Sequence, residues 1–235
     1  RLLRLPSFTS FWIARLFTIS GYQMLCVAIG WHLYDITGSA LDLGLIGLVQ
    51  FLPRVLFALM AGEVADRFDR RRVAAVSQFL QGVCALGLMA SFWLPEYARA
   101  MIYAVSFLVG AARTFEFPAT QAMLPRVVPA ELLPSAIALS SSAVQVATIA
   151  APALGGIVYV LGATTVYALT GSLYLIACFL MARVQFIKRD HEPTLVRAAG
   201  WDSLLAGIRF IRSKPAILGA ISLDLFAVLL GGATA

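Results

Sequence analysis

The chain has 235 residues, of which 60% are hydrophobic and only 13% are charged. A soluble globular domain carries about 25% charged residues, so this composition excludes an ordinary soluble fold and indicates a protein surrounded by lipid. The net charge of +6 does not indicate nucleic acid, because the positive residues lie in short segments between apolar runs, as in the loops of membrane proteins.

Apolar runs of membrane-spanning length follow one another along the chain. A helix needs about 20 mainly apolar residues to cross the hydrocarbon core of a bilayer. We predict transmembrane helices over residues 10–34, 43–62, 73–94, 99–120, 135–160 and 164–185, followed by the start of a seventh from residue 216 onward. Strands are not expected, because an open sheet leaves backbone polar groups unpaired in lipid. The predicted fold class is therefore an all-α membrane protein.

The distribution of Lys and Arg predicts the orientation of these helices. Fourteen of the 18 Lys and Arg residues lie in segments 1–9, 63–72, 121–134 and 183–215, which share one side of a six-span layout. Arg99 alone lies in the loops of the other side. Because cytoplasmic loops collect positive residues, we predict a multi-pass protein of a bacterial inner membrane with a cytoplasmic N-terminus.

Three segments make up the predicted domain organisation. Residues 1–185 form a six-helix transmembrane bundle, residues 186–215 a cytoplasmic linker, and residues 216–235 the start of a seventh transmembrane helix. Within the linker, apolar residues recur at helical spacing opposite basic ones, which indicates an amphipathic helix. It lies either on the anionic leaflet or on the cytoplasmic ends of the bundle. The incomplete seventh span predicts that the chain is a fragment of a longer protein.

The most specific pattern lies between the second and third spans and reads Gly-Glu-Val-Ala-Asp-Arg-Phe-Asp-Arg-Arg-Arg over residues 62–72. It resembles the loop signature of the major facilitator superfamily, G-x-x-x-D-R-x-G-R-[RK], with matches at Gly62, Asp66, Arg67, Arg70 and Arg71. The resemblance implies that Asp66 pairs with the other half of a transporter and stabilises its outward-facing state. Asp69 stands where the signature has Gly, so we expect this turn to be tighter or differently capped.

A second pattern, Ala-Pro-Ala-Leu-Gly-Gly, occupies residues 151–156 of the fifth span. It resembles the G-P-x-x-G-G core of a motif of major facilitator antiporters, matching at Pro152, Gly155 and Gly156 and carrying Ala151 in place of the first Gly. Small residues every four positions allow another helix to pack closely, and Pro152 favours a bend. The resemblance implies solute exchange, although ordinary small-residue packing accounts for the same residues.

Longer stretches extend the resemblance over nearly the whole chain. Residues 48–73, residues 117–139 and the start of the seventh span are similar to the enterobactin-exporter-like branch of the superfamily. This implies a twelve-helix fold of two six-helix halves, with the solute held between them near the middle of the membrane. The chain then supplies the N-terminal half, and its partner is a C-terminal half.

Charged side chains inside the spans are the candidates for binding solute or protons, because a charge within lipid faces the bundle or water. Arg54 lies midway along the second span. Arg113 and Glu116 are three residues apart on the fourth span and so are able to pair. Asp224 in the seventh span has no cation within one turn, which favours it narrowly over Glu116 as the proton carrier.

The remaining polar residues inside the spans receive no predicted role. Arg15 lies near a helix end, where its side chain is expected to reach the interface. His32 and His191 are expected at the interface or in solvent, and the three cysteines are dispersed and serve as small apolar residues. The sequence therefore predicts no metal site, and it predicts no cofactor.

These observations predict a secondary transporter that exports a small solute by alternating access in exchange for protons. The sequence does not select among a siderophore, a drug and a metabolite. A non-transporting membrane scaffold is the main alternative, although it would not need the two motifs. A membrane-embedded enzyme is disfavoured, because intramembrane catalysis needs a Ser–His pair, paired acids or clustered metal ligands, which this sequence lacks.

Overall fold

The computed structural model of the chain describes residues 2–187 and residue 219, and every regular element within them is helical. The long helices are α1 (Pro6–Thr37), α2 (Ala40–Arg67), α3 (Arg70–Gly87), α4 (Ala98–Val127), α5 (Leu133–Tyr159) and α6 (Ala163–Ala182). Short 3₁₀ turns lie at η1 (Leu2–Arg4), η2 (Leu88–Phe92), η3 (Pro95–Tyr97) and η4 (Ala130–Leu132). The predicted linker helix and seventh span fall outside the described residues.

All six predicted spans are confirmed as helices long and apolar enough to cross a membrane. Polar residues and glycines at the connections explain where these helices begin and end. Gly38 ends α1 with φ of 62°, a left-handed conformation that glycine adopts without strain. Ser39 then caps α2, because its hydroxyl accepts a hydrogen bond from the backbone N–H of Asp42 at 3.3 Å. Gly162, with φ of 102°, makes the turn before α6.

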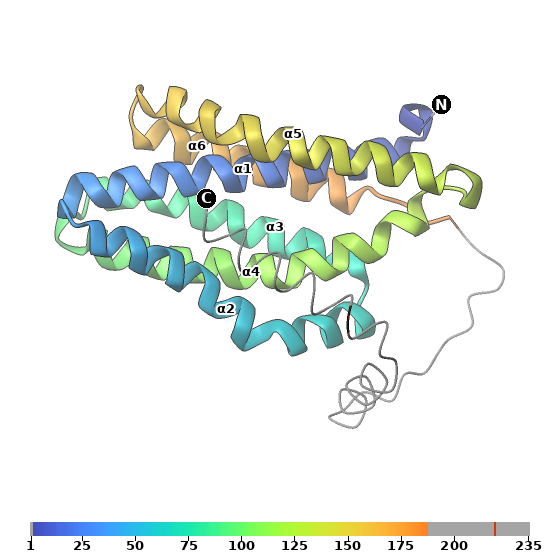
Figure 1. The fold of residues 1–235 in the computed structure, drawn as a ribbon, viewed down its shortest axis with the longest axis horizontal. Coiled ribbons are helices and arrows are strands. Elements are labelled where there is room, and N and C mark those ends of the chain that lie inside the picture. The colour runs from blue at the N-terminus through green and yellow to red at the C-terminus, as the bar shows by residue number, and fades with distance from the viewer. Residues whose placement is uncertain (1, 188–218, 220–235) are drawn as a thin grey trace. The chain divides into compact units, whose positions relative to one another are not determined.

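The six helices form one bundle in which α1 packs against α5 and α6, while α4 packs against α2 and α3 (Figure 1). Contacts between α3 and α6 join these two groups. In Figure 1, α5 and α2 lie at opposite edges, with α1 and α4 between them. In the most apolar 18-residue stretch of each span, only 11% of the residues are buried for α2 and 17% for the span that contains α5. The corresponding share is 50% for the span that contains α3. Both edge helices therefore present apolar surface that this bundle does not cover.

Loop positions define the two ends of the bundle. The basic end carries residues 2–5, 68–69, 128–132 and 183–187, and the opposite end carries residues 38–39, 88–97 and 160–162. Hydrogen bonds tie the segments of the basic end together. The N–H of Ile187 donates to the carbonyl of Arg126 at 2.9 Å, and the N–H of Gln185 donates to the hydroxyl of Ser7 at 3.3 Å.

Two apolar clusters fill the bundle, one towards each end. The cluster towards the basic end includes Phe8, Phe11, Met123 and Met181, and the cluster towards the opposite end includes Leu25, Ile29, Tyr167 and Tyr174. Between them lie buried polar side chains that we call the polar layer: Thr18, Gln78, Gln81 and Glu116. Buried polar groups are costly unless they bond to one another, and hydrogen bonds join these four side chains.

Candidate functional site

Glu116 is the centre of the polar layer, and its carboxylate is held by α3. The residue is only 5% exposed. Its Oε1 accepts a hydrogen bond from Gln78 Nε2 at 2.9 Å, and its Oε2 accepts one from Gln81 Nε2 at 2.7 Å. Residues three apart share a helix face, which allows both amides to reach one carboxylate. Gln78 Nε2 also lies 3.3 Å from the hydroxyl oxygen of Thr18, so the layer joins α1, α3 and α4.

Arg113 does not pair with Glu116, although the sequence allows this pair. No ion pair joins them among the described residues; instead, the guanidinium carbon of Arg113 lies 3.7 Å from the centre of the Tyr22 ring. The spacing of three residues would allow the pair, but partners on other helices decide the directions of the two side chains. Arg113 therefore turns towards α1 and makes a cation–π contact, while Glu116 turns towards α3.

Three helices meet at a polar cluster around Tyr22, which we call the α1–α2–α4 site. It consists of Tyr22, Cys26, Gln50 and Arg113. The Oε1 of Gln50 accepts hydrogen bonds from the Tyr22 hydroxyl at 3.3 Å and from Cys26 Sγ at 3.5 Å. Arg54 follows Gln50 by four residues on α2, about one turn along the same face, and Arg113 lies over the Tyr22 ring. Two predicted candidates, Arg54 and Arg113, are thereby brought into one region.

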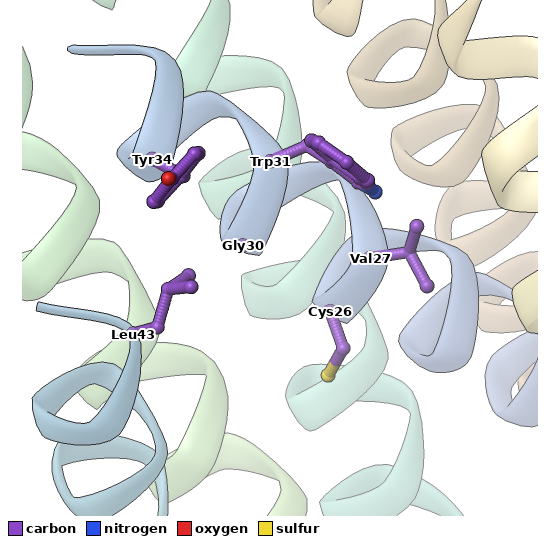
Figure 2. A pocket seen from close by; sticks show the side chains of 6 residues that line it. All are labelled: Cys26, Val27, Gly30, Trp31, Tyr34 and Leu43. Atoms are coloured by element: carbon purple, nitrogen blue, oxygen red, sulfur yellow. The ribbon is translucent and has the colours of Figure 1, made fainter. Parts of the chain in front are cut away.

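A cavity of about 350 Å³ adjoins this site between α1 and α2 (Figure 2). Its lining residues are Cys26, Val27, Gly30, Trp31, Tyr34 and Leu43. Most of these residues are apolar or aromatic, and Trp31 and Tyr34 are 55% and 43% exposed on α1. Such a lining suits the aromatic or aliphatic part of an organic molecule.

Close backbone contact fixes α2 against α4 at this site. A Cβ atom added to Gly110 would lie 2.6 Å from the backbone oxygen of Gln50. Only glycine allows the two helices to approach so closely, and this places the side chain of Gln50 within reach of Tyr22. Pro53, buried inside α2, lies less than one turn from the contact.

Arg15 has partners that the sequence did not indicate. Its Nη2 donates to Gln121 Oε1 at 3.0 Å, and its Nη1 donates to the Ser140 hydroxyl at 3.3 Å. Polar side chains of α4 and α5 therefore hold Arg15 in the structure, which the sequence did not predict. Arg15 thus joins α1, α4 and α5 on the basic-end side of the polar layer.

The loop signature between α2 and α3 forms a network of arginines at the basic end. Arg67 pairs with Glu63 at 2.7 Å, while Arg70 lies 3.7 Å from Asp66 and donates to the backbone oxygens of Ala65 and Ala122. The Asp66 side chain is 69% exposed and therefore open to a further partner. Gly62, one turn before Asp66, has open space around its Cα.

Asp69, which stands where the family signature has Gly, caps the helix that follows the loop. Its carboxylate accepts a hydrogen bond from the backbone N–H of Arg71 at 2.9 Å, and it caps the N-terminus of α3. The expectation of a differently capped turn is thereby confirmed. Arg71 also donates from Nη1 to the backbone oxygen of Val184 at 3.1 Å, which ties the loop to the end of α6.

The antiporter-like residues of α5 pack against α1. Ala151 is buried, and a Cβ added to Gly155 would lie 2.9 Å from the Cα of Met24. A Cβ added to Gly156 would meet nothing within 4 Å. Helix α5 continues through Pro152 to Tyr159. Gly155 therefore permits the close approach expected of a small-residue stripe, whereas Gly156 lies on a different face.

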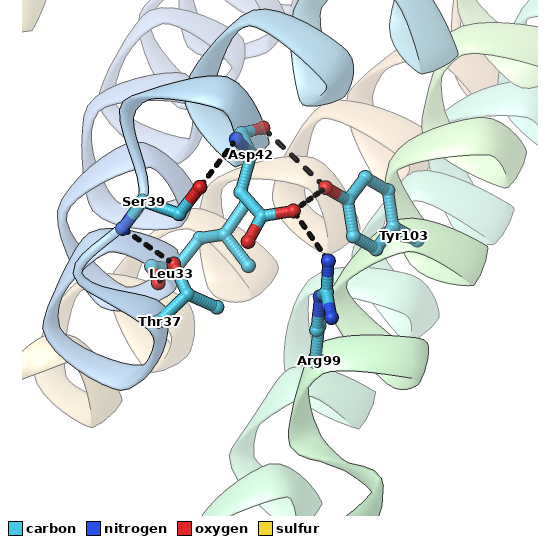
Figure 3. Close-up of polar contacts among 6 residues, drawn as sticks. All are labelled: Leu33, Thr37, Ser39, Asp42, Arg99 and Tyr103. Carbon is cyan, nitrogen blue, oxygen red and sulfur yellow. Dashed lines mark hydrogen bonds and ion pairs between the residues drawn. The ribbon is translucent and has the colours of Figure 1, made fainter.

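A second buried acid lies at the opposite end, where the sequence suggested only a loop (Figure 3). Asp42 is 2% exposed, and its Oδ1 accepts hydrogen bonds from Arg99 Nη2 and from the Tyr103 hydroxyl, each at 2.7 Å. Its backbone N–H donates to Ser39, whose own N–H lies 3.3 Å from the hydroxyl of Thr37. The start of α2 is thus attached to the start of α4.

His32 is buried rather than solvated, which corrects the expectation from the sequence. Its Nδ1 lies 2.8 Å from the Tyr167 hydroxyl, and its ring stacks on Phe92 with centroids 4.6 Å apart. Side chains of α6 and η2 cover it from both sides. A cavity of about 480 Å³ at the opposite end is lined in part by His32, Asp35 and Tyr159, and the hydroxyl of Tyr159 donates to Asp35 at 2.8 Å.

Comparison with known proteins identifies the family. Residues 2–230 match the family described as transmembrane secretion effector. The chain belongs to this family of the major facilitator superfamily. The superfamily and branch predicted from the sequence are thereby confirmed.

Relatives of this transmembrane secretion effector chain include proteins named enterobactin exporter EntS. Those of Citrobacter koseri, Shigella boydii and Escherichia coli O1:K1 are each 26% identical to it over 93% of the chain and 52% of the relative. The chain therefore spans about half the length of the curated relatives it matches, as expected for one half of a major facilitator fold.

Several residues of the candidate sites in this transmembrane secretion effector chain were not singled out by sequence reasoning. They are Tyr22, Gln50, Gln78, Gln81 and Asp42. Two glutamines three apart in an otherwise apolar span were a usable signal for the polar layer, because an amide in lipid needs a partner. Asp224 and His191 lie outside the described residues.

Proposed function

We propose that the chain is the N-terminal half of a secondary transporter that exports a small organic solute across a bacterial inner membrane. The observation that carries this proposal is the α1–α2–α4 site, a charged and aromatic cluster beside a cavity inside an apolar bundle. Charged groups at membrane depth mark solute and ion pathways, because their burial is otherwise costly. Membership of the transmembrane secretion effector family and the named exporters among the relatives support the same reading.

Alternating access would use the uncovered faces of α2 and α5. A C-terminal six-helix half packed there would complete the cavity, and rocking of the halves would open the α1–α2–α4 site to each side in turn. Asp66 is exposed and thus able to pair with that second half, which supports a gating role for the loop signature. The proposed orientation places the basic end in the cytoplasm.

The α1–α2–α4 site and the cavity beside it favour a solute with aromatic rings and several hydrogen-bond acceptors. Arg54 and Arg113 are donors without acceptor atoms, and Trp31 and Tyr34 offer flat apolar surfaces. Enterobactin, named for the relatives, is the first solute to test. We also propose that export is exchanged for protons, with Glu116 and Asp224 as the candidate proton carriers and the Ala151–Gly156 motif as the antiporter element.

The test is efflux from vesicles that contain the full-length protein and an imposed pH gradient. We expect Arg54→Gln and Arg113→Gln to lower the rate at least about tenfold, which corresponds to about 1.4 kcal/mol of lost interaction. Arg4→Gln, an exposed change at the basic end, is the matched control. Gradient-driven efflux that survives in both arginine variants would contradict the site. A folded protein without any solute flux would favour a membrane scaffold instead.

Orientation is testable separately by cysteine labelling. In a background that lacks Cys26, Cys84 and Cys178, we expect a Trp93→Cys variant to react with an impermeant reagent from outside, because Trp93 is 86% exposed at the opposite end. A Phe68→Cys variant at the basic end should react only after the membrane is opened. Labelling of Phe68→Cys in intact cells would contradict the proposed orientation.

A further inference from the structure

Glu116 is a buried carboxylate that no cation neutralises within the described residues. The two nearby arginines are engaged elsewhere, Arg113 with the Tyr22 ring and Arg15 with Gln121. Both carboxylate oxygens depend instead on neutral amides from α3. An ion pair that stabilises the fold therefore does not explain why this acid is buried.

The two glutamines that bind Glu116 each have an amide oxygen that makes no hydrogen bond within the described residues. The Oε1 atoms of Gln78 and Gln81 are buried and have no hydrogen-bond partner among the described residues. A half-turn about the last side-chain bond of glutamine exchanges its amide oxygen and nitrogen. The same pair of residues is therefore able to donate to an ionised carboxylate or to accept from a protonated one.

We propose that Glu116 is the proton-binding group of this half and that Gln78 and Gln81 are positioning residues that hold it in both protonation states. This inference rests on the proposed proton-coupled export and names the group that carries the proton. Hydronium transfers a proton to Glu116 Oε2, which forms an O–H bond and leaves water. The Gln81 amide then turns so that its Oε1 accepts the new O–H, and proton release to water reverses both steps.

The surroundings of Glu116 fit this role. The charged and titratable side chains around it are Arg15 of α1, Arg113 of its own helix, which is directed towards Tyr22, and Tyr174 of α6. The arginines favour the ionised form from a distance, and burial in the polar layer favours the neutral form. The sequence favoured Asp224 narrowly because the charge of Arg113 opposes protonation of Glu116, and the direction of Arg113 towards Tyr22 weakens that objection.

Infrared difference spectroscopy of the purified full-length protein tests this inference without transport. A protonated carboxyl group has a C=O stretch that disappears on ionisation, so we expect a titrating band that is lost in Glu116→Gln. Gln78→Leu and Gln81→Leu should keep the band but move its midpoint to higher pH, because a hydrogen bond donated to the charged carboxylate is stronger than one accepted from the neutral acid. Glu131→Gln, an exposed change on η4, is the control and should leave the midpoint unchanged.

The outcomes separate this inference from the proposed function. A band that persists in Glu116→Gln would overturn the role of Glu116, and an unchanged midpoint in both leucine variants would overturn the positioning role of the glutamines, even if gradient-driven efflux is observed. Efflux that ignores the pH gradient would instead overturn proton coupling, whatever the band shows. If Glu116→Gln fails to fold, the midpoints of the two leucine variants decide alone.

Discussion

Two adjacent glycines of α5 offer a sharp test of how this helix packs. A Cβ at Gly155 would lie 2.9 Å from the Cα of Met24, which is at least about 0.6 Å inside the optimal carbon–carbon separation of about 3.5 Å. The neighbour is backbone, so it cannot move aside by changing a rotamer. Gly156 meets nothing within 4 Å. Alanine at Gly155 should therefore push α5 away from α1, whereas alanine at Gly156 should be accommodated.

The size of the effect follows from two terms. Replacing Gly by Ala inside a helix gains about 0.8–1.0 kcal/mol of helix propensity, and this gain is common to both variants. Overpacking a close contact costs about 1–3 kcal/mol. We therefore expect Gly156→Ala to be at least as stable as the wild type and Gly155→Ala to be about 1–3 kcal/mol less stable than Gly156→Ala.

Unfolding of the full-length protein in one detergent measures this difference, with both variants compared side by side. Circular dichroism against temperature or denaturant is sufficient, and efflux should fall in Gly155→Ala if the motif needs close contact. Equal stability of the two variants would refute the reasoning, because it would show that the backbone of α1 at Met24 does not limit the approach of α5.

Three further outcomes follow from the structure. Gly110→Ala should destabilise the protein by about 1–3 kcal/mol relative to Gly87→Ala, because only the Cβ at position 110 would press on backbone. Unfolding of both variants measures the difference. Asp66→Asn should lower efflux without changing the unfolding temperature, since the side chain is 69% exposed; wild-type efflux would exclude a gating role. Asp69→Ala should cost about 0.5–2 kcal/mol of unfolding free energy through loss of the α3 cap, and no change would contradict that cap.

The order and approximate positions of the helices were predictable because they depend on chain-local properties, although single helix ends differ from the predicted limits by up to seven residues. Hydrophobic length locates each span, and Gly38, Ser39 and Asp69 mark helix ends through their own backbone and side-chain preferences. The loop signature was found for the same reason, since all its residues lie within 11 consecutive positions, residues 62–72. Local pattern was sufficient wherever the interacting groups are neighbours in sequence.

Side-chain partners were not predictable where they come from other helices. The spacing of Arg113 and Glu116 allows a pair, but the ring of Tyr22 on one side and Gln81 on the other decide the directions. His32 has no local sign of burial, because Tyr167 lies 135 positions away. Such contacts depend on how helices are rotated about their axes, which a single apolar span leaves undetermined.

The attachment of Arg99 to Asp42 bears on how the chain enters the membrane. Arg99 is the exception among the loop Lys and Arg residues, which otherwise lie at the basic end. Its charge is matched by the Asp42 carboxylate, 2.7 Å away. Under the proposed orientation, Asp42 precedes α4 in the chain and therefore reaches the outer side of the membrane before Arg99 during synthesis. With the basic end in the cytoplasm, the outward transfer of one negative and one positive charge moves no net charge through the membrane potential. A single Arg on that side thus becomes compatible with insertion.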